Sequence, residues 1–216
     1  MGEIAAGFPL ATRVFARHRI DFCCHGGDPL QQVCEKKKLD VSAVLDEIEK
    51  ELAEPQEDAR RWDSEPLSDL IDHIVDTHHV FLREEMPRLE AMLRKVHRVH
   101  HARAPEQLDG LLSVYIAMKE ELDQHMMKEE QILFPMIRQG SGEMADGPIS
   151  VMLQEHDDAG EALRQIRDLT ENYIVPQDAC NTWRALWHGL EALEADLHQH
   201  IHLENNILFP RALAGR

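Results

Sequence analysis

Apolar residues recur at helical spacing along almost the whole chain. One clear run comprises Val41, Val44, Leu45, Ile48 and Leu52, which would line one face of a helix. The apolar/polar alternation typical of strands is absent, and β-branched and aromatic residues are sparse. We therefore predict an all-α protein.

Glycine and proline breaks divide this pattern into two parts. Short helices predicted near residues 9–18, 29–37 and 41–54 would form a small helical N-terminal domain over residues 1–54, followed by a polar linker at 55–65. Four long helices are then predicted at 66–101, 105–139, 148–172 and 180–213. Their short connections favour an antiparallel four-helix bundle over residues 66–216. Pro87 and Pro135 lie inside long helical stretches, where we expect kinks or interruptions.

One phrase is written twice, as "HMMKEEQILFP" at 125–135 and "HIHLENNILFP" at 200–210. Each contains a histidine and a glutamate four residues apart, His125 with Glu129 and His200 with Glu204, which share a helix face. A lone histidine lies on the helix before each pair: position 79 precedes His125 by 46 residues, and His156 precedes His200 by 44. The bundle thus reads as one helix pair repeated, with four histidines and two glutamates facing its core.

Four imidazoles and two carboxylates suit two metal ions, each with two histidines and both bridged by the glutamates. Nitrogen and oxygen donors without cysteine favour iron over structural zinc. A single His-x-x-x-Glu pair is more often a surface ion pair, so the prediction depends on the repetition. The spacing does not decide between His78 and His79, of which only one can point at the centre.

Two further acids lie near the predicted ligands. Glu155 precedes His156, and Glu121 lies one helical turn before His125. Both are candidates for holding ligands in place or for carrying protons, although an exposed helix carboxylate is an equally good interpretation. The remaining histidines, including His198 and His202, are expected to be mostly solvated.

The balance of 23 basic and 40 acidic residues gives a net charge of −17. This argues against non-specific binding to nucleic acid and against docking on anionic membranes. No apolar run is long enough to span a membrane. The four cysteines (Cys23, Cys24, Cys34 and Cys180) form no disulfide framework, which favours a reducing, cytoplasmic location.

Several motifs together resemble one family. The "DFCC" turn, the acidic linker and the phrases "HMMKEEQILFP" and "HIHLENNILFPRAL" are similar to the Repair of Iron Centres proteins, which are hemerythrin-like and contain two irons. The pattern Asp76-x-x-His79 resembles the first-ligand helix of that family and favours His79. The resemblance implies two non-haem irons bridged by the two glutamates and an oxo group, with the ligands His79, His125, Glu129, His156, His200 and Glu204.

The resemblance also implies a function. Such proteins restore iron–sulfur clusters damaged by nitric oxide or oxidants, by supplying iron or by processing nitric oxide, so damaged iron–sulfur proteins are the expected partners. The paired Cys23 and Cys24 would bind iron or exchange electrons, whereas Cys34 and Cys180 would be structural. A homodimer formed through the N-terminal helices is expected. Nitric oxide reduction, or a hemerythrin-like module that binds or senses oxygen, nitric oxide or iron without turnover, needs the same ligands, so the sequence leaves these alternatives open.

Overall fold

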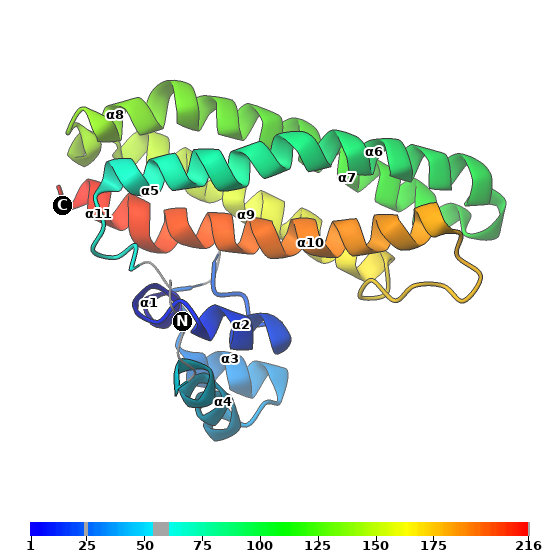
Figure 1. Cartoon of the computed structure of the whole chain (residues 1–216), viewed down its shortest axis with the longest axis horizontal. Helices are drawn as coiled ribbons and strands as arrows, with labels where there is room; N and C mark the ends of the chain where they lie inside the picture. The colour runs from blue at the N-terminus through cyan, green and yellow to red at the C-terminus, as the bar shows by residue number, and fades with distance from the viewer. Residues whose placement is uncertain (24–25, 54–60, 216) are drawn as a thin grey trace.

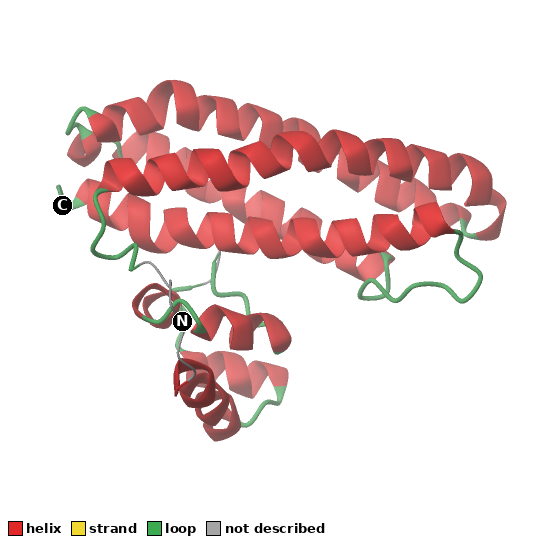
Figure 2. Cartoon of the chain, viewed as in Figure 1, coloured by secondary structure: helices red, strands yellow, loops and turns green. Residues whose placement is uncertain are grey.

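A computed structural model of the chain describes residues 1–23, 26–53 and 61–215, and none of these residues lies in a strand. Long helices lie side by side as a bundle, and a group of short helices packs against one side of it (Figure 1). Figure 2 shows the same arrangement by secondary structure. The all-α class and the bundle after an N-terminal helical part are confirmed.

The N-terminal part contains four short helices, one more than predicted. They are α1 (Gly2–Gly7), α2 (Ala11–Arg17), α3 (Leu30–Lys37) and α4 (Val41–Ala53). Phe15 of α2 is fully buried and packs 5.9 Å from the ring of Phe22, inside a hydrophobic cluster separate from those of the bundle. The amino group of Met1 donates to the carbonyl of Gly26 at 2.9 Å, which fixes α1.

The bundle has four long helical rods, three of them composite. The first is α5 (Leu67–His73), η1 (Ile74–His79) and α6 (Val80–His100); the second is α7 (Pro105–Lys128), η3 (Glu129–Leu133) and α8 (Phe134–Arg138); the third is α9 (Asp146–Leu169); the fourth is α10 (Asn181–Leu203), η5 (Glu204–Leu208) and α11 (Phe209–Leu213). Helix α6 packs on α7 and α10, and α7 packs on α9. Short 3₁₀ turns, η2 (His101–Arg103) and η4 (Gly142–Met144), lie in two of the connections.

The elements η1, η3 and η5 are π-helical turns, in which an amide bonds to the carbonyl five residues earlier. The amide of Phe134 donates to the carbonyl of Glu129, and that of Phe209 donates to the carbonyl of Glu204. Pro135 and Pro210 follow directly and have no N–H to extend the α-helical ladder. The repeated Phe-Pro therefore accompanies a local widening of both helices.

Pro87 and Pro135, where kinks or interruptions are expected, behave differently. Pro135 follows directly after a π-helical turn and lies at the start of α8, as expected for an interruption. Helix α6 instead continues through Pro87, so the helix is not interrupted there. The carbonyl of Met86 accepts a hydrogen bond from the hydroxyl of Tyr115 at 3.0 Å, which ties this stretch of α6 to α7.

A buried polar layer separates two hydrophobic clusters in the bundle. We call the cluster that contains Trp183 and Trp187 the far cluster, and the cluster that contains Phe134 and Phe209 the near cluster. Each long rod passes from one cluster to the other and carries histidine or glutamate between them, as the flanking pairs show: Ile74 and Leu82, Met126 and Leu133, Met152 and Ala159, Leu197 and Leu203. The apolar clusters therefore hold the polar layer at a fixed depth.

The N-terminal part contacts the bundle beside this layer. The ring of Phe22 meets His202 edge-on at 5.4 Å, and Asn206 donates to the carbonyl of Phe22 at 3.2 Å. A Cβ atom at Gly2 would lie 2.0 Å from Oδ1 of Asn206, so a larger residue there would displace the Asn206 side chain. His202 is buried, which corrects the expectation that it is solvated.

The expected linker at 55–65 lies partly outside the described residues. Within its described end, Trp62 joins the near cluster, and Arg211 donates to its carbonyl at 2.8 Å. Among the described helices, none has the length and apolarity needed to cross a membrane.

Candidate metal centre

The six predicted ligands come from all four rods, and the π-helical turns lie at three of their positions. His79 ends η1, Glu129 begins η3 and Glu204 begins η5. His125 and His200 lie one turn before the two glutamates, and His156 lies within α9. All six side chains are buried. The two clusters on either side exclude water from these polar groups.

One set of ligand atoms joins the first and last rods to Glu129. The Nε2 atom of His79 lies 3.3 Å from Oε2 of Glu129 and 3.2 Å from Nε2 of His200. His200 in turn lies 3.1 Å from Oε1 of Glu204. The ligand atoms of His79, Glu129, His200 and Glu204 all lie within 4.8 Å of one another.

A second set uses the same two glutamates. The Nε2 atom of His125 lies 3.4 Å from Oε2 of Glu129, and that of His156 lies 3.2 Å from Oε2 of Glu204. The two imidazole Nε2 atoms are 3.1 Å apart. These four ligand atoms also fall within 4.8 Å of one another. Glu129 and Glu204 therefore belong to both sets.

The donor atoms of this layer fit a cation better than they fit each other. Both carboxylate oxygens of Glu129 and the Oε2 of Glu204 accept no hydrogen bond from the described residues, although they are buried. Facing imidazole nitrogens compete for one proton, and buried carboxylate oxygens without a hydrogen bond are costly. A bound cation would satisfy all of these lone pairs. The layer could therefore hold a metal ion, and its imidazole and carboxylate donors suit iron.

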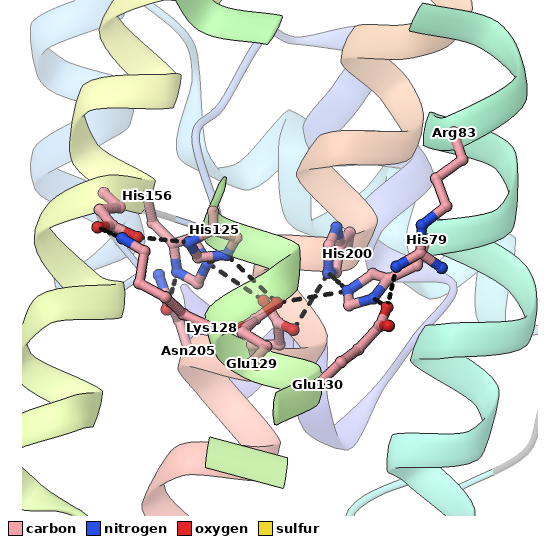
Figure 3. A network of polar contacts seen from close by, with 11 residues as sticks. His79, Arg83, His125, Lys128, Glu129, Glu130, His156, His200 and Asn205 are labelled. Atoms are coloured by element: carbon pink, nitrogen blue, oxygen red, sulfur yellow. Dashed lines mark hydrogen bonds and ion pairs between the residues drawn. The ribbon is translucent and has the colours of Figure 1, made fainter. Parts of the chain in front are cut away.

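Three of the four imidazoles are held from behind through their other nitrogen (Figure 3). The Nδ1 atoms of His79, His125 and His156 bond to Glu130 at 2.6 Å, to Glu155 at 2.9 Å and to Asn205 at 2.7 Å. These acceptors hold the Nδ1 proton, so that each Nε2 lone pair points into the layer. Arg83 pairs with Glu130, and Lys128 pairs with Glu155.

Sequence reasoning proposed Glu155 for such a role but missed Glu130 and Asn205. Each of these two directly follows a shared glutamate, Glu129 or Glu204. The repeat therefore contained a signal for both residues. In each half, the residue after the His-x-x-x-Glu pair bonds to the lone histidine of the same half.

The fourth imidazole, that of His200, has no such acceptor. Its neighbour is His78, which precedes His79 in the sequence as Glu155 precedes His156. The two rings stack 5.4 Å apart, with only 1° between their planes, and Nδ1 of His78 bonds to Asp196 at 2.9 Å. The Nδ1 atom of His200 has no hydrogen-bond partner among the described residues. Thus His78 is buried behind a candidate ligand, while His79 contributes its Nε2 to a ligand set.

The charges of the layer compensate one another in the metal-free chain. Burial lowers the pKa of His125, but the carboxylates of Glu129 and Glu204 outweigh burial and raise it to about 9. Burial raises the pKa of Glu204, yet the imidazoles of His200 and His156 hold it well below its usual range. The layer therefore keeps its carboxylates ionised, ready to balance cationic charge.

A pocket of about 200 Å³ opens from the protein surface toward one side of this layer. Its walls include His125, Glu121, Glu155, Lys128 and Asp158. Glu121 is exposed on the wall, whereas Glu155 reaches the imidazole of His125. Both acids proposed from the sequence thus lie between solvent and one candidate ligand.

The cysteines occupy different surroundings. Cys23 is buried, its thiol donates to Asp21 at 3.3 Å, and its carbonyl accepts from Asn205 at 3.3 Å. Cys24 lies outside the described residues. Cys34 is buried in the N-terminal cluster, in line with a structural role. Cys180 is exposed, and its Sγ lies 3.3 Å from Nε2 of His100, which joins the end of the first rod to the start of α10.

Comparisons with known proteins agree with this description. Residues 70–212 match the family described as "Hemerythrin HHE cation binding domain", and residues 1–52 match a domain of unknown function, ScdA_N. The "Iron-sulfur cluster repair protein YtfE" of Pectobacterium atrosepticum is 48% identical over 215 residues, covering 100% of this chain and 96% of that protein. The protein of the same name from Escherichia coli O81 is 47% identical with the same coverage.

Proposed function

Since the chain belongs to the hemerythrin-like iron–sulfur cluster repair family, we propose that it binds two irons in the buried layer and uses them to restore damaged iron–sulfur clusters. The observation that carries this proposal is the sharing of Glu129 and Glu204 by two ligand sets. A single-ion site needs only one such set.

In this proposal the six ligands divide into two equivalent groups. His79 and His200 hold one ion, His125 and His156 hold the other, and the glutamates bridge both. Two ligand carboxylates offset part of the charge of two buried cations. Iron held there would supply binding positions for nitric oxide or oxygen, or would itself be the ion supplied to a damaged cluster.

The surrounding side chains orient the ligands and control access. Glu130, Glu155 and Asn205 fix the imidazoles by accepting their outer N–H groups. Glu121 and Glu155 would guide cations or protons through the pocket beside His125, since carboxylates on a pocket wall attract positive charge. Lys128 pairs with Glu155, so its ammonium group would have to move aside before an entering cation could bind that carboxylate.

The N-terminal cysteines are proposed to receive or pass on iron or electrons. The carbonyl of Cys23 is one side chain away from the imidazole of His156, which favours communication between the two parts. The buried thiol of Cys23 would have to become exposed to act, because reactivity requires access and a stabilised thiolate. If replacing Cys23 and Cys24 together by alanine leaves cluster recovery unchanged, this role is wrong.

The proposal includes a cytoplasmic location and a homodimer formed through the N-terminal helices. Phe8, Leu45 and Leu52 expose apolar side chains in that part of the chain, which is consistent with a contact surface. Light scattering coupled to size-exclusion chromatography would measure the mass, and a monomer at micromolar concentration would remove the dimer from the proposal.

Iron counting with cluster recovery tests the central claim. Purified protein should contain about two irons per chain, with charge-transfer absorption, and it should restore a client enzyme whose [4Fe–4S] cluster was damaged by nitric oxide. The changes Glu129→Ala and His200→Ala should abolish both properties, while His188→Ala, on an exposed position of α10, should retain them.

Iron that binds reversibly to nitric oxide, without cluster recovery, would instead support a binding or sensing module. Nitrous oxide formation by the reduced protein would support reductase activity.

A further inference from the structure

A second group of metal-ligating side chains lies at the far end of the bundle, where α6 turns into α7 (Figure 1). His97 and His101 lie four residues apart at the end of the first rod, so they share one face. Asp109, in the second turn of α7, faces them. None of these residues belongs to the buried layer.

The three side chains converge on one point. The Nε2 atom of His97 lies 2.7 Å from Oδ1 of Asp109, and that of His101 lies 3.0 Å from the same oxygen. The two imidazole rings are 4.9 Å apart between centroids. All three ligand atoms fall within 4.8 Å of one another. Both histidines therefore already present the same nitrogen to a shared carboxylate.

The local backbone holds this arrangement. The 3₁₀ turn η2 joins the helices with His101 as its first residue, and Pro105 starts α7 with a fixed φ angle. His100, between the two histidines, turns to another face and contacts Cys180. Arg103 pairs with Asp178, which keeps that cation occupied away from Asp109. Three ligands on one short hairpin lose little conformational freedom when they bind an ion.

Two imidazoles and one carboxylate on a single face are the donor set of mononuclear sites for divalent transition metals. We propose that His97, His101 and Asp109 bind one divalent first-row transition-metal ion. The site differs from the buried layer in two ways: its ligands form one set, not two sets joined by common carboxylates, and its side chains are 26%, 44% and 58% exposed. The ion therefore keeps solvent ligands and exchanges freely, and the net charge of −17 favours its approach.

Cobalt uptake by the iron-loaded, full-length protein tests this site. Cobalt(II) binds nitrogen and oxygen donors more tightly than iron(II), so it is a sensitive probe. Equilibrium dialysis against cobalt(II), with iron and cobalt counted in the same sample, should give about one cobalt per chain without loss of iron. His97→Ala and Asp109→Asn should each weaken cobalt binding at least tenfold, whereas His188→Ala should not change it.

The Asp109→Asn variant separates a metal site from a structural contact. Asparagine still accepts a hydrogen bond from either imidazole, but it no longer supplies the anionic ligand. If this variant binds cobalt as tightly as the unchanged protein, the three residues form only a hydrogen-bonded cluster and the proposal is overturned. Cobalt uptake matched by equal loss of iron would place the binding in the buried layer and would also overturn it. Because the core iron is counted separately, neither result bears on the proposed repair function.

Discussion

Asn205 accepts a hydrogen bond from the imidazole of His156 at 2.7 Å, and its amide nitrogen donates to the carbonyl of Cys23 at 3.3 Å. One side chain thus joins a candidate ligand to the cysteine turn. Two consecutive hydrogen bonds therefore connect the candidate metal centre to the N-terminal part of the chain.

Replacing Asn205 by leucine should weaken iron binding on the His125–His156 side by about 10- to 100-fold, because the imidazole of His156 loses the group that orients it. Iron retained during dialysis against a chelator measures this effect. Asn206→Ala is the matched control, since Asn206 also reaches Cys23 and Phe22 but contacts His202 rather than His156. Equal loss of iron in both variants would mean that docking of the N-terminal part, not the orientation of His156, is what matters.

Glu129→Gln and Glu130→Gln change adjacent residues with different expected roles. Glu129 belongs to both ligand sets, so its change should reduce iron from about two per chain toward none. Glu130 belongs to neither ligand set and accepts the outer N–H of His79, so its change should weaken binding by about 10- to 100-fold and leave both ions present at saturating iron. Iron analysis with absorption spectra distinguishes the two. Retention of both ions by Glu129→Gln would contradict the bridging role.

His79→Gln should leave only one tightly held iron, because His79 supplies an imidazole to one set alone. His78→Phe should retain both, since an aromatic ring there can still stack on His200. The measurement is again iron per chain, with circular dichroism to confirm folding. The reverse outcome, loss of iron only when residue 78 is changed, would show that the histidines were assigned in the wrong order.

Acid should destabilise the contact at His202. Burial lowers the pKa of His202 to about 4, while an unfolded histidine titrates near 6.5. The unfolded chain therefore binds more protons between these values, and the stability from the neutral imidazole, present above pH 6.5, is lost as pH falls toward 4. The expected slope is about 1.4 kcal/mol per pH unit.

Thermal unfolding of metal-free protein at a series of pH values measures this effect. His202→Gln cannot take up a proton, so its unfolding midpoint should fall less steeply between pH 6.5 and 4. Burial also lowers the pKa values of His198 and His200, so the variant should keep a residual slope over the same pH range. Identical slopes in both proteins would exclude His202 as the source.

The fold followed from the sequence because helical spacing and proline positions are local signals. The repeated His-x-x-x-Glu phrase predicted which faces meet, since residues four apart share a face on any helix. The bundle in turn brings those faces together at one depth. The iron-binding role of the six residues is a proposal, but the repeat alone predicted the convergence of five of them; His79 was favoured over His78 by the family resemblance.

The parts that sequence did not predict depend on contacts between distant residues. His202 is covered by Phe22, which is 180 positions away in the chain, so no local pattern reveals its burial. The pairing of His79 with Glu130 depends on how two rods are rotated against each other. Helical spacing left His78 and His79 undecided for a related reason: both residues lie in η1, which does not follow the 3.6-residue period of an α-helix.

The π-helical turns also have a consequence for how this chain tolerates length changes. Each turn holds one residue more than the α-helix around it would, so downstream side chains are rotated by about 100° relative to an uninterrupted helix. Deleting Gln131 would remove this extra residue and restore the ordinary pitch, with Phe134 still facing the near cluster and His125 still in place. The three rods that contain such a turn should therefore tolerate the loss of one residue within it, whereas a deletion in an α-helical stretch would rotate every later side chain by about 100° relative to the ligands.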